Sequence, residues 1–344
     1  MSLKRVGLVG YGYWGTNIAS NLQKLDMSQL IEFVGIAEPN KEKQIACVAK
    51  LSLNTPKINI FSSMQEMLAG PKIDAVILAA PPDQNMNLIF LAVVNGLDVL
   101  VEKPLMLSYN QAIALDLIAE ENNATTKVWI DYTPLYDSNM LAIRNLLNTL
   151  PHGSIQHILA VRANNSPDRV NKVNYSAMWD LASHDIALLD SLNKSIGHPI
   201  HIRATGSKEY TTLNLTYPSG LRATVISGWT SVNKQRLLSI AGDNFYMSDT
   251  SNFTLPNYIN FPPSAPFTHI STEGVEKVVS PIVEYPDHDS YMLEPLYKLL
   301  EDFLCDSDKY LDYTKPDLVL GTRVLKVLLA AERSLISQKV ENIK

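Results

Sequence analysis

Gly10-Tyr11-Gly12-Tyr13-Trp14-Gly15 follows the apolar run from Val6 to Val9 and precedes an amphipathic stretch from Gly15 to Leu25. A GxGxxG turn between a strand and a helix is the fingerprint of a dinucleotide-binding βαβ unit. Its glycines let the backbone approach a pyrophosphate, and the N-terminus of the helix favours the negative charge of that group. The pattern therefore predicts a dinucleotide site here; the alternative is a glycine turn with a structural role alone.

Glu38 stands at the end of the next apolar run, Ile31 to Ala37. A carboxylate at this point of such a unit accepts hydrogen bonds from the adenosine ribose, and it repels a 2′-phosphate. We therefore expect NAD rather than NADP. Lys41 and Lys43 lie close by and keep NADP open as the alternative.

Up to about residue 130, short β-branched runs alternate with longer amphipathic segments, which is the pattern of a parallel, doubly wound α/β sheet. The predicted strands are Val6 to Val9, Ile31 to Ala37, Ile58 to Phe61, Ile73 to Ala79, Val99 to Glu102 and Lys127 to Ile130. The predicted helices are Gly15 to Leu25, Lys41 to Leu51, Ser63 to Leu68, Gln84 to Asn95 and Ser108 to Asn122.

After about residue 150 the pattern changes to strands at Ile155 to Val161, Thr211 to Tyr217 and Leu221 to Ser227. The last two alternate apolar and polar residues around a Pro-Ser-Gly turn, as a half-buried hairpin does, and this predicts an antiparallel sheet. The proline-rich stretch from Leu255 to Pro286 is predicted as loop and edge structure, and helices follow at Tyr291 to Cys305 and Asp317 to Ser337. We expect two domains: residues 1–125, a Rossmann domain, and residues 126–344, an α+β domain whose last helices pack back on the first.

The bulk properties narrow the functional classes. The formal net charge is -6 and the basic residues are dispersed, so nucleic acid is not an expected partner. Cys47 and Cys305 are the two cysteines and have no CxxC spacing, and the histidines form no ligand set, so we expect no disulfide and no metal. The apolar run after Lys4 and Arg5 is broken by glycines, and no stretch reads as a membrane span, so we expect a cytoplasmic protein.

Two further segments carry residues typical of catalysis. Glu102-Lys103-Pro104 ends the fifth predicted strand, on the side of the sheet where ligands of α/β folds bind; a surface ion pair is the alternative. Asp180 and His184 lie four residues apart before a helix, so the carboxylate could hold the imidazole as an acid/base pair. A helix-start aspartate beside an incidental histidine is the other interpretation.

The sequence resembles the Gfo/Idh/MocA (glucose-fructose oxidoreductase and inositol dehydrogenase) family. The matching motifs are the turn at 10–15, Ala80-Pro81-Pro82, Val-Leu-Val-Glu-Lys-Pro-Leu at 99–105 and Trp-Asp-Leu-Ala-Ser-His-Asp at 179–185, in the family's order. Trp229, Arg236 and Gly242 are similar to a pattern in its substrate-domain sheet. The resemblance is strongest to the branch associated with polysaccharide and nucleotide-sugar metabolism.

The resemblance implies an NAD(P)-dependent oxidoreductase with a Rossmann domain and an open, mostly antiparallel sheet whose face joins subunits into a homo-oligomer, a dimer or tetramer. It gives catalytic roles to Lys103, Asp180 and His184, with His184 taking the proton of a substrate hydroxyl. The residues expected to contact the cofactor are Gly10, Gly12, Tyr13, Trp14, Gly15, Glu38, Ala80, Pro81, Glu102 and Lys103.

The substrate implied is a small sugar, cyclitol or nucleotide sugar. Four polar residues are candidates to bind it: Tyr132, Arg162, Asn165 and Arg169. Asn85 and Tyr132 depart from the family, where histidines are common at these positions. An imine or conjugated-ring reductase and a cofactor-binding regulator without turnover are the alternative functions, and the retained lysine, aspartate and histidine disfavour the regulator.

Overall fold

The computed structural model describes residues 3–51, 58–105, 110, 113–114, 126–149, 153–243, 245–249, 267–271, 276–279, 288–306 and 308–343. Two compact units emerge from the contacts within the chain. The first joins Met1–Thr133 to Met292–Gly321, and the second joins Pro134–Tyr291 to Thr322–Lys344. The domain boundary expected after residue 125 stays a prediction.

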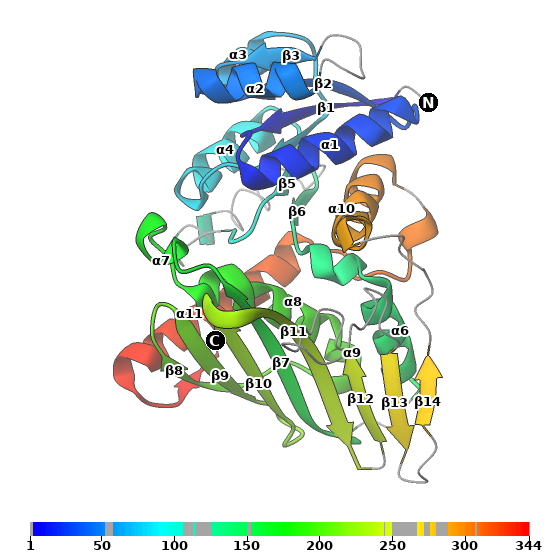
Figure 1. The fold of residues 1–344 in the computed structure, drawn as a ribbon, viewed down its shortest axis with the longest axis vertical. Coiled ribbons are helices and arrows are strands. Elements are labelled where there is room, and N and C mark those ends of the chain that lie inside the picture. Colours follow the sequence, from blue (N-terminus) through cyan, green and yellow to red (C-terminus); the bar gives the residue numbers. More distant parts are fainter. Residues whose placement is uncertain are drawn as a thin grey trace. The chain divides into compact units, whose positions relative to one another are not determined.

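The first unit is built on a six-stranded parallel sheet with the order β3-β2-β1-β4-β5-β6 (Figure 1). Its strands are β1 (Lys4–Val9), β2 (Ile31–Ala37), β3 (Asn59–Phe61), β4 (Ala75–Leu78), β5 (Asp98–Val101) and β6 (Val128–Ile130). Its helices are α1 (Tyr13–Met27), α2 (Lys41–Leu51), α3 (Met64–Ala69), α4 (Pro82–Val94) and most of α10 (His288–Cys305), followed by the 3-10 turn η3 (Asp308–Tyr310).

Burial explains why these residues form a doubly wound sheet. All of β4 and the last four residues of β1 are buried, so side chains on both faces of the central strands are covered. Such continuous apolar runs are typical of parallel strands between two helical layers. Helix α1 buries Ile18, Leu22 and Leu25, which recur at helical spacing on one face. The predicted α/β class is confirmed.

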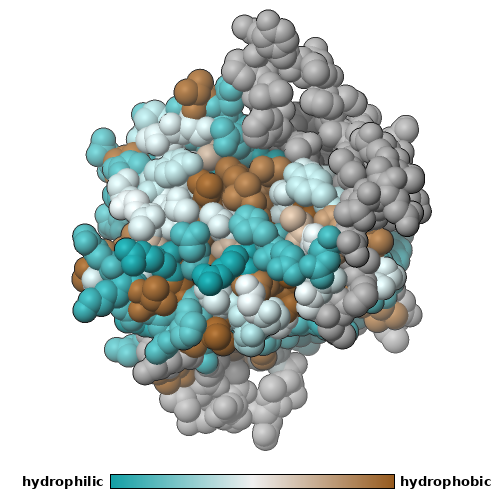
Figure 2. All heavy atoms as spheres, turned by 90° about the horizontal axis from the view of Figure 1, so that it is seen from below, coloured by the Kyte–Doolittle hydropathy of each residue, from teal (hydrophilic) through white to brown (hydrophobic). Residues whose placement is uncertain are grey.

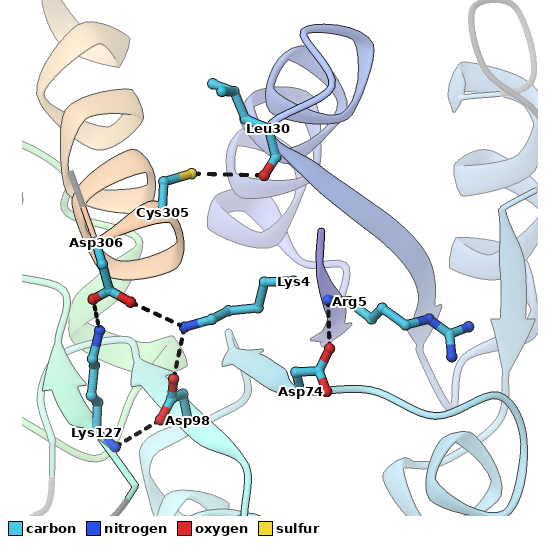
Figure 3. A network of polar contacts seen from close by, with 8 residues as sticks. All are labelled: Lys4, Arg5, Leu30, Asp74, Asp98, Lys127, Cys305 and Asp306. Atoms are coloured by element: carbon cyan, nitrogen blue, oxygen red, sulfur yellow. Dashed lines mark hydrogen bonds and ion pairs between the residues drawn. The ribbon is translucent and has the colours of Figure 1, made fainter. Parts of the chain in front are cut away.

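A polar network joins the end of α10 to the N-terminal ends of three strands (Figure 3). The Lys4 ammonium lies 2.9 Å from Asp98 Oδ2 and 3.9 Å from Asp306 Oδ2. Asp98 Oδ1 accepts the backbone N–H of Lys127 at 2.9 Å, and the Lys127 ammonium pairs with Asp306. Cys305 Sγ lies 3.9 Å from the carbonyl oxygen of Leu30. These contacts fix the returning segment 292–321 against β1, β5 and β6.

The second unit is built on a nine-stranded sheet with the order β14-β13-β12-β11-β7-β10-β9-β8-β15. Its strands are β7 (Ile155–Asn165), β8 (His201–Gly206), β9 (Tyr210–Thr216), β10 (Arg222–Gly228), β11 (Thr230–Gly242), β12 (Phe245–Asp249), β13 (Phe267–Ser271), β14 (Glu276–Val279) and β15 (Glu341–Asn342). Its helical segments are the 3-10 turn η1 (Thr133–Tyr136, which begins at the end of the first unit), α6 (Ser138–Leu147), α7 (Arg169–Lys172), the π-helical turn η2 (Met178–Ala182), α8 (Ser183–Ser191), α9 (Asn193–Ile196) and most of α11 (Leu318–Ser337).

The sheet of the second unit is antiparallel except where β7 and β10 run parallel. The predicted hairpin is confirmed, because Leu215 pairs with Ala223 and Leu213 pairs with Val225 across β9 and β10. The other face of these strands is largely polar, and α8 and α11 lie against the buried face (Figure 1). Alternation of this kind is what a sheet covered on one side requires.

Parts of the predicted pattern fall on undescribed residues. The helix expected over Ser108 to Asn122 lies outside the described residues except at 110 and 113–114. Within the stretch from Leu255 to Pro286, β13 and β14 are the described elements, and they form one edge of the sheet. Across the described part of the chain, no helix is both long enough and apolar enough to cross a membrane. Figure 2 shows brown hydrophobic areas separated by teal and white on the face in view.

Candidate active site

The glycine-rich turn has three glycines in three different environments. Gly10 has a φ of +94°, and a Cβ there would lie 2.5 Å from the carbonyl oxygen of Ala79. A Cβ on Gly15 would lie 2.3 Å from the carbonyl oxygen of Gly10, whereas a Cβ on Gly12 would meet nothing within 4 Å. The first and third glycines thus permit the turn and the close packing of α1, and the second keeps the backbone open to a ligand.

The N-terminus of α1 is suited to an anion. Gly12 is the N-cap residue of this helix and has no side chain that could accept a hydrogen bond from the first turn. The first backbone N–H groups of a helix lack partners within the helix, and its dipole favours negative charge there. The turn and the helix end therefore fit the pyrophosphate of a dinucleotide.

Glu38 lies beside this turn and is 4% exposed. Its Oε2 accepts the backbone N–H of Tyr11 at 2.7 Å, and its Oε1 accepts the backbone N–H of Asn40 at 2.9 Å. The carboxylate thus joins the end of β2 to the glycine-rich turn. Two carboxylate oxygens offer about four acceptor positions, so these bonds leave capacity for ribose hydroxyls.

The turn after β4 and the segment after β5 carry the other residues expected at the cofactor. Ala80 follows Ala79, which packs against Gly10, so this turn adjoins the glycine-rich turn. Asn85 of α4 is 1% exposed, and its amide nitrogen lies 3.2–3.4 Å from the carbonyl oxygens of Glu102, Pro104 and Leu105. Asn85 therefore supports the backbone that carries Lys103, a role that its local sequence did not indicate.

Trp14, Asp131 and Tyr132 lie between α1 and the end of β6. The indole N–H of Trp14 donates to Asp131 Oδ2 at 2.9 Å, and Asp131 is 1% exposed. Tyr13 is 83% exposed and Tyr132 is 2% exposed. Trp14 thus ties the start of α1 to the strand end, and its contact with a cofactor stays a prediction, as do those of Tyr13 and Pro81.

In the second unit, Asp180 is a buried carboxylate held from two sides. It is 2% exposed and lies in the π-helical turn η2. Its Oδ2 accepts the indole N–H of Trp229 at 2.9 Å and pairs with Nη1 of Arg169. Trp229 is 0% exposed and packs in a cluster with Ala177 and Leu181. A buried carboxylate needs such donors to remain ionised.

His184 follows in the first turn of α8 and is half-buried. The π-helical turn before it changes the angular offset between Asp180 and His184 from that of an uninterrupted α-helix. Turns of this kind are frequent at functional sites. The orientation of His184 by Asp180 stays a prediction.

The predicted substrate residues of β7 and α7 occupy different positions. Arg162 of β7 binds Asp185 of α8 in a forked arrangement, with Nε 3.0 Å from both carboxylate oxygens and Nη2 2.8 Å from Oδ1. Asn165 is exposed. Because it lies three residues after Arg162 on the same strand, its side chain points to the other face of the sheet. Arg169 reaches Asp180 from α7. Arg162 and Arg169 thus approach the two ends of the Asp180–Asp185 segment, and Asn165 does not share the face of Arg162.

Within the described residues, no group of three or more histidine, cysteine, aspartate or glutamate side chains could hold a metal ion.

Residues 4–131 match the family described as "Oxidoreductase family, NAD-binding Rossmann fold" (GFO_IDH_MocA). A galactose 1-dehydrogenase of Pseudomonas fluorescens is 30% identical over 153 residues, 44% of this chain and 44% of the relative. A UDP-N-acetylglucosamine 3-dehydrogenase of Acidithiobacillus ferrooxidans is 23% identical over 237 residues, 69% of this chain and 66% of the relative. The chain spans only 38% and 30% of the length of two uncharacterized oxidoreductases, from Escherichia coli and Streptococcus pneumoniae.

Among solved structures, myo-inositol 2-dehydrogenase from Lactobacillus plantarum has a TM-score of 0.77 at 17% identity and covers 100% of both chains. At this identity the likeness concerns the fold, and it extends over both units. Together with the glycine-rich turn and Glu38, the match over residues 4–131 identifies this region of the chain as similar to the NAD-binding Rossmann fold of the Gfo/Idh/MocA oxidoreductase family.

Proposed function

We propose that the protein is an NAD-dependent dehydrogenase that oxidises a ring hydroxyl of a sugar, cyclitol or nucleotide sugar to a ketone. The observation that carries this proposal is the glycine-rich turn, where Gly12 leaves space beside an uncapped helix end and Glu38 stands next to it. Bound NAD would supply the acceptor for the hydride that leaves the substrate carbon.

The chain's own groups would hold the cofactor in two places. The backbone N–H groups at the start of α1 would bind the pyrophosphate, and Glu38 would accept the ribose hydroxyls. Glu38 already accepts hydrogen bonds from the backbone N–H groups of Tyr11 and Asn40, so the position of its carboxylate does not depend on the cofactor. This preformed carboxylate supports NAD over NADP.

The proton would be handled by side chains outside the glycine-rich turn. We assign His184 as the base that takes the proton of the substrate hydroxyl, Asp180 as the residue that orients it, and Lys103 as the group that stabilises the alkoxide. These roles follow the resemblance of the motifs at 99–105 and 179–185. The burial of Asp180 between Trp229 and Arg169 supports a fixed carboxylate in that arrangement.

The substrate class is supported by the names of the relatives. One is a galactose 1-dehydrogenase, another a UDP-N-acetylglucosamine 3-dehydrogenase and a third an inositol 2-dehydrogenase. All three names specify a sugar, a nucleotide sugar or a cyclitol and the numbered position at which it is dehydrogenated. We carry this class to the present chain as a proposal.

The test is a fluorescence screen for NADH formation with a panel of sugars, cyclitols and nucleotide sugars. With an active substrate, oxidation should rise with pH, because a base must be unprotonated to accept the proton. His184→Ala should lower turnover by roughly a hundredfold and remove that rise. His198→Ala is the matched control, because His198 lies in the same unit, 52% exposed beside Asp190.

Near-normal turnover of His184→Ala with the same pH profile would place the base elsewhere. A panel that yields no NADH, while an imine or conjugated substrate consumes it, would favour the reductase alternative. NADH binding without any turnover would favour a regulator.

A further inference from the structure

Two arginines face each other across the centre of the second unit's sheet. Arg162 of β7 and Arg236 of β11 are register partners, so both side chains stand on the same face. Directly opposite residues of an antiparallel pair have Cβ atoms about 4.5–5.5 Å apart, and like charges there are destabilising. Asp185 of α8 binds Arg162, which identifies the face as the one covered by helices. Asp185 balances the charge of Arg162, whereas Nη1 of Arg236 donates to the backbone carbonyl oxygens of Gln235 at 2.8 Å and Ala163 at 3.3 Å.

A bulge in β11 brings a third cation to the same place. Thr230 pairs with Asn165 and Gln235 pairs with Ala163, so the residues from Ser231 to Lys234 bulge out opposite Asn164. Bulges of this kind re-aim side chains and are frequent beside active sites. Lys234 ends the bulge, two residues before Arg236, and is half-buried.

The environment of Lys234 is electropositive. Burial, and then the charges of Arg236 and Arg162, lower the pKa of Lys234 from its usual value. Both effects disfavour its protonated form. An anion placed among the three cations would reverse the second effect and stabilise the charged lysine.

Polar atoms without partners lie beside these cations. Asn164 is two residues from Arg162 on β7 and therefore shares its face, and its Oδ1 is buried without a hydrogen-bond partner among the described residues. Ser227 of β10 is the register partner of Arg162, is 0% exposed, and its hydroxyl also lacks a partner there. Buried polar atoms of this kind are rare and call for an explanation, such as a bound ligand.

We propose that Arg162, Lys234 and Arg236, together with Asn164, form a subsite for an anionic group of the substrate, a carboxylate or a phosphate carried by a sugar. The cations would bind the oxyanion, and Asn164 would accept a hydrogen bond from a neighbouring hydroxyl. Asp185, which fixes Arg162, follows His184 directly in α8, so the subsite adjoins the assigned base. The inference rests on the proposed function and narrows its substrate to acidic or phosphorylated sugars.

The test compares the binding of glucose, glucuronate and glucose 1-phosphate to the full chain by calorimetry at fixed, low ionic strength. Glucuronate reports on a carboxylate and glucose 1-phosphate on a phosphate. At least one of them should bind about tenfold or more tightly than glucose, as a charge-assisted hydrogen bond allows. If neither binds more tightly than glucose, including the case in which nothing binds, the inference is overturned.

Variants identify the site. Lys234→Gln should remove the preference for the anionic sugar, and Lys234→Arg should retain it. Arg222→Gln is the matched control, because Arg222 is exposed on the opposite face of the same sheet and its Nη1 lies 3.4 Å from Thr216 Oγ1. A loss of anion preference in Arg222→Gln, or its persistence in Lys234→Gln, would place the anion elsewhere.

The outcome separates this inference from the proposed function, because the binding experiment uses no NAD. Anion preference that depends on Lys234, with no NADH formed from any substrate, would leave the subsite standing and overturn the dehydrogenase. NADH formation from neutral sugars that is unchanged by Lys234→Gln would support the dehydrogenase and overturn the anionic subsite.

Discussion

Replacing Trp229 by Phe tests whether the buried carboxylate of Asp180 depends on its indole donor. Trp229 is 0% exposed, and its Nε1 lies 2.9 Å from Asp180 Oδ2. Phe keeps the aromatic packing against Ala177 and Leu181 but cannot donate. Asp180 would then retain its pair with Arg169, whose side chain is 41% exposed.

The loss in stability can be worked out from these contacts. A hydrogen bond to a charged group contributes about 1.5–3 kcal/mol, and water cannot replace the donor at a buried site. The cavity left by the smaller ring adds about 1 kcal/mol. The sum is about 3 kcal/mol, which lowers the Tm of a unit of this size by about 10 °C.

Trp179→Phe is the control, and differential scanning fluorimetry is the assay. The indole of Trp179 donates to Glu332 Oε1 at 2.9 Å, and Glu332 is half-buried, so water can satisfy it after the change. We expect a smaller fall in Tm for Trp179→Phe and, once a substrate is known, a loss of turnover for Trp229→Phe alone. Equal falls in Tm for the two variants would refute the reasoning that burial of the Asp180 carboxylate determines the loss in stability.

Three further predictions concern cofactor, assembly and pH. NADH should bind more tightly than NADPH in a fluorescence titration, because Glu38 repels a 2′-phosphate; preference for NADPH would contradict the role of Glu38. Light scattering should show a homo-oligomer, because Ile226 and Leu237 are half-buried apolar residues on the sheet face that no described helix covers, and a monomer at micromolar concentration would count against this. Burial raises the pKa of the Cys47 thiol from 9.0 to about 11, so the unfolded chain loses this proton first. Stability should fall as pH rises from about 9 to about 11, and less steeply in Cys47→Ala; identical thermal-unfolding profiles would contradict this.

Much of the first unit could be predicted from sequence because its determinants are local. The runs of β1 and β2, the glycines between β1 and α1, and Glu38 at the end of β2 lie within one βαβ unit, where period and turn chemistry decide the structure. The observed strands begin and end within one or two residues of the predicted positions, because element ends are defined by hydrogen bonds that the sequence pattern does not fix.

The second unit's site depended on contacts that no local pattern carries. Trp229 reaches Asp180 across 49 residues, and a donor to a buried carboxylate leaves no sequence signal at that distance. Side chains alternate between the two faces of the sheet along β7, so Asn164 rather than Asn165 lies on the same face as Arg162. The sequence pattern predicted this strand only as far as Val161, before either asparagine. The bulge that carries Lys234 breaks the alternation on which strand predictions rely.

The return of residues 292–321 to the first unit has a consequence for synthesis of the chain. Trp129 packs on Phe303 with ring centroids 5.4 Å apart, and the N–H of Ile130 donates to the carbonyl oxygen of Pro316 at 2.8 Å. Phe303 is 0% exposed, so it supplies core that residues 1–133 lack by themselves. On the ribosome, the Rossmann sheet is translated before residues 292–321, so its contacts remain incomplete until that later segment has emerged. Until then the apolar side chains at the β6 edge lack the cover that Phe303 supplies.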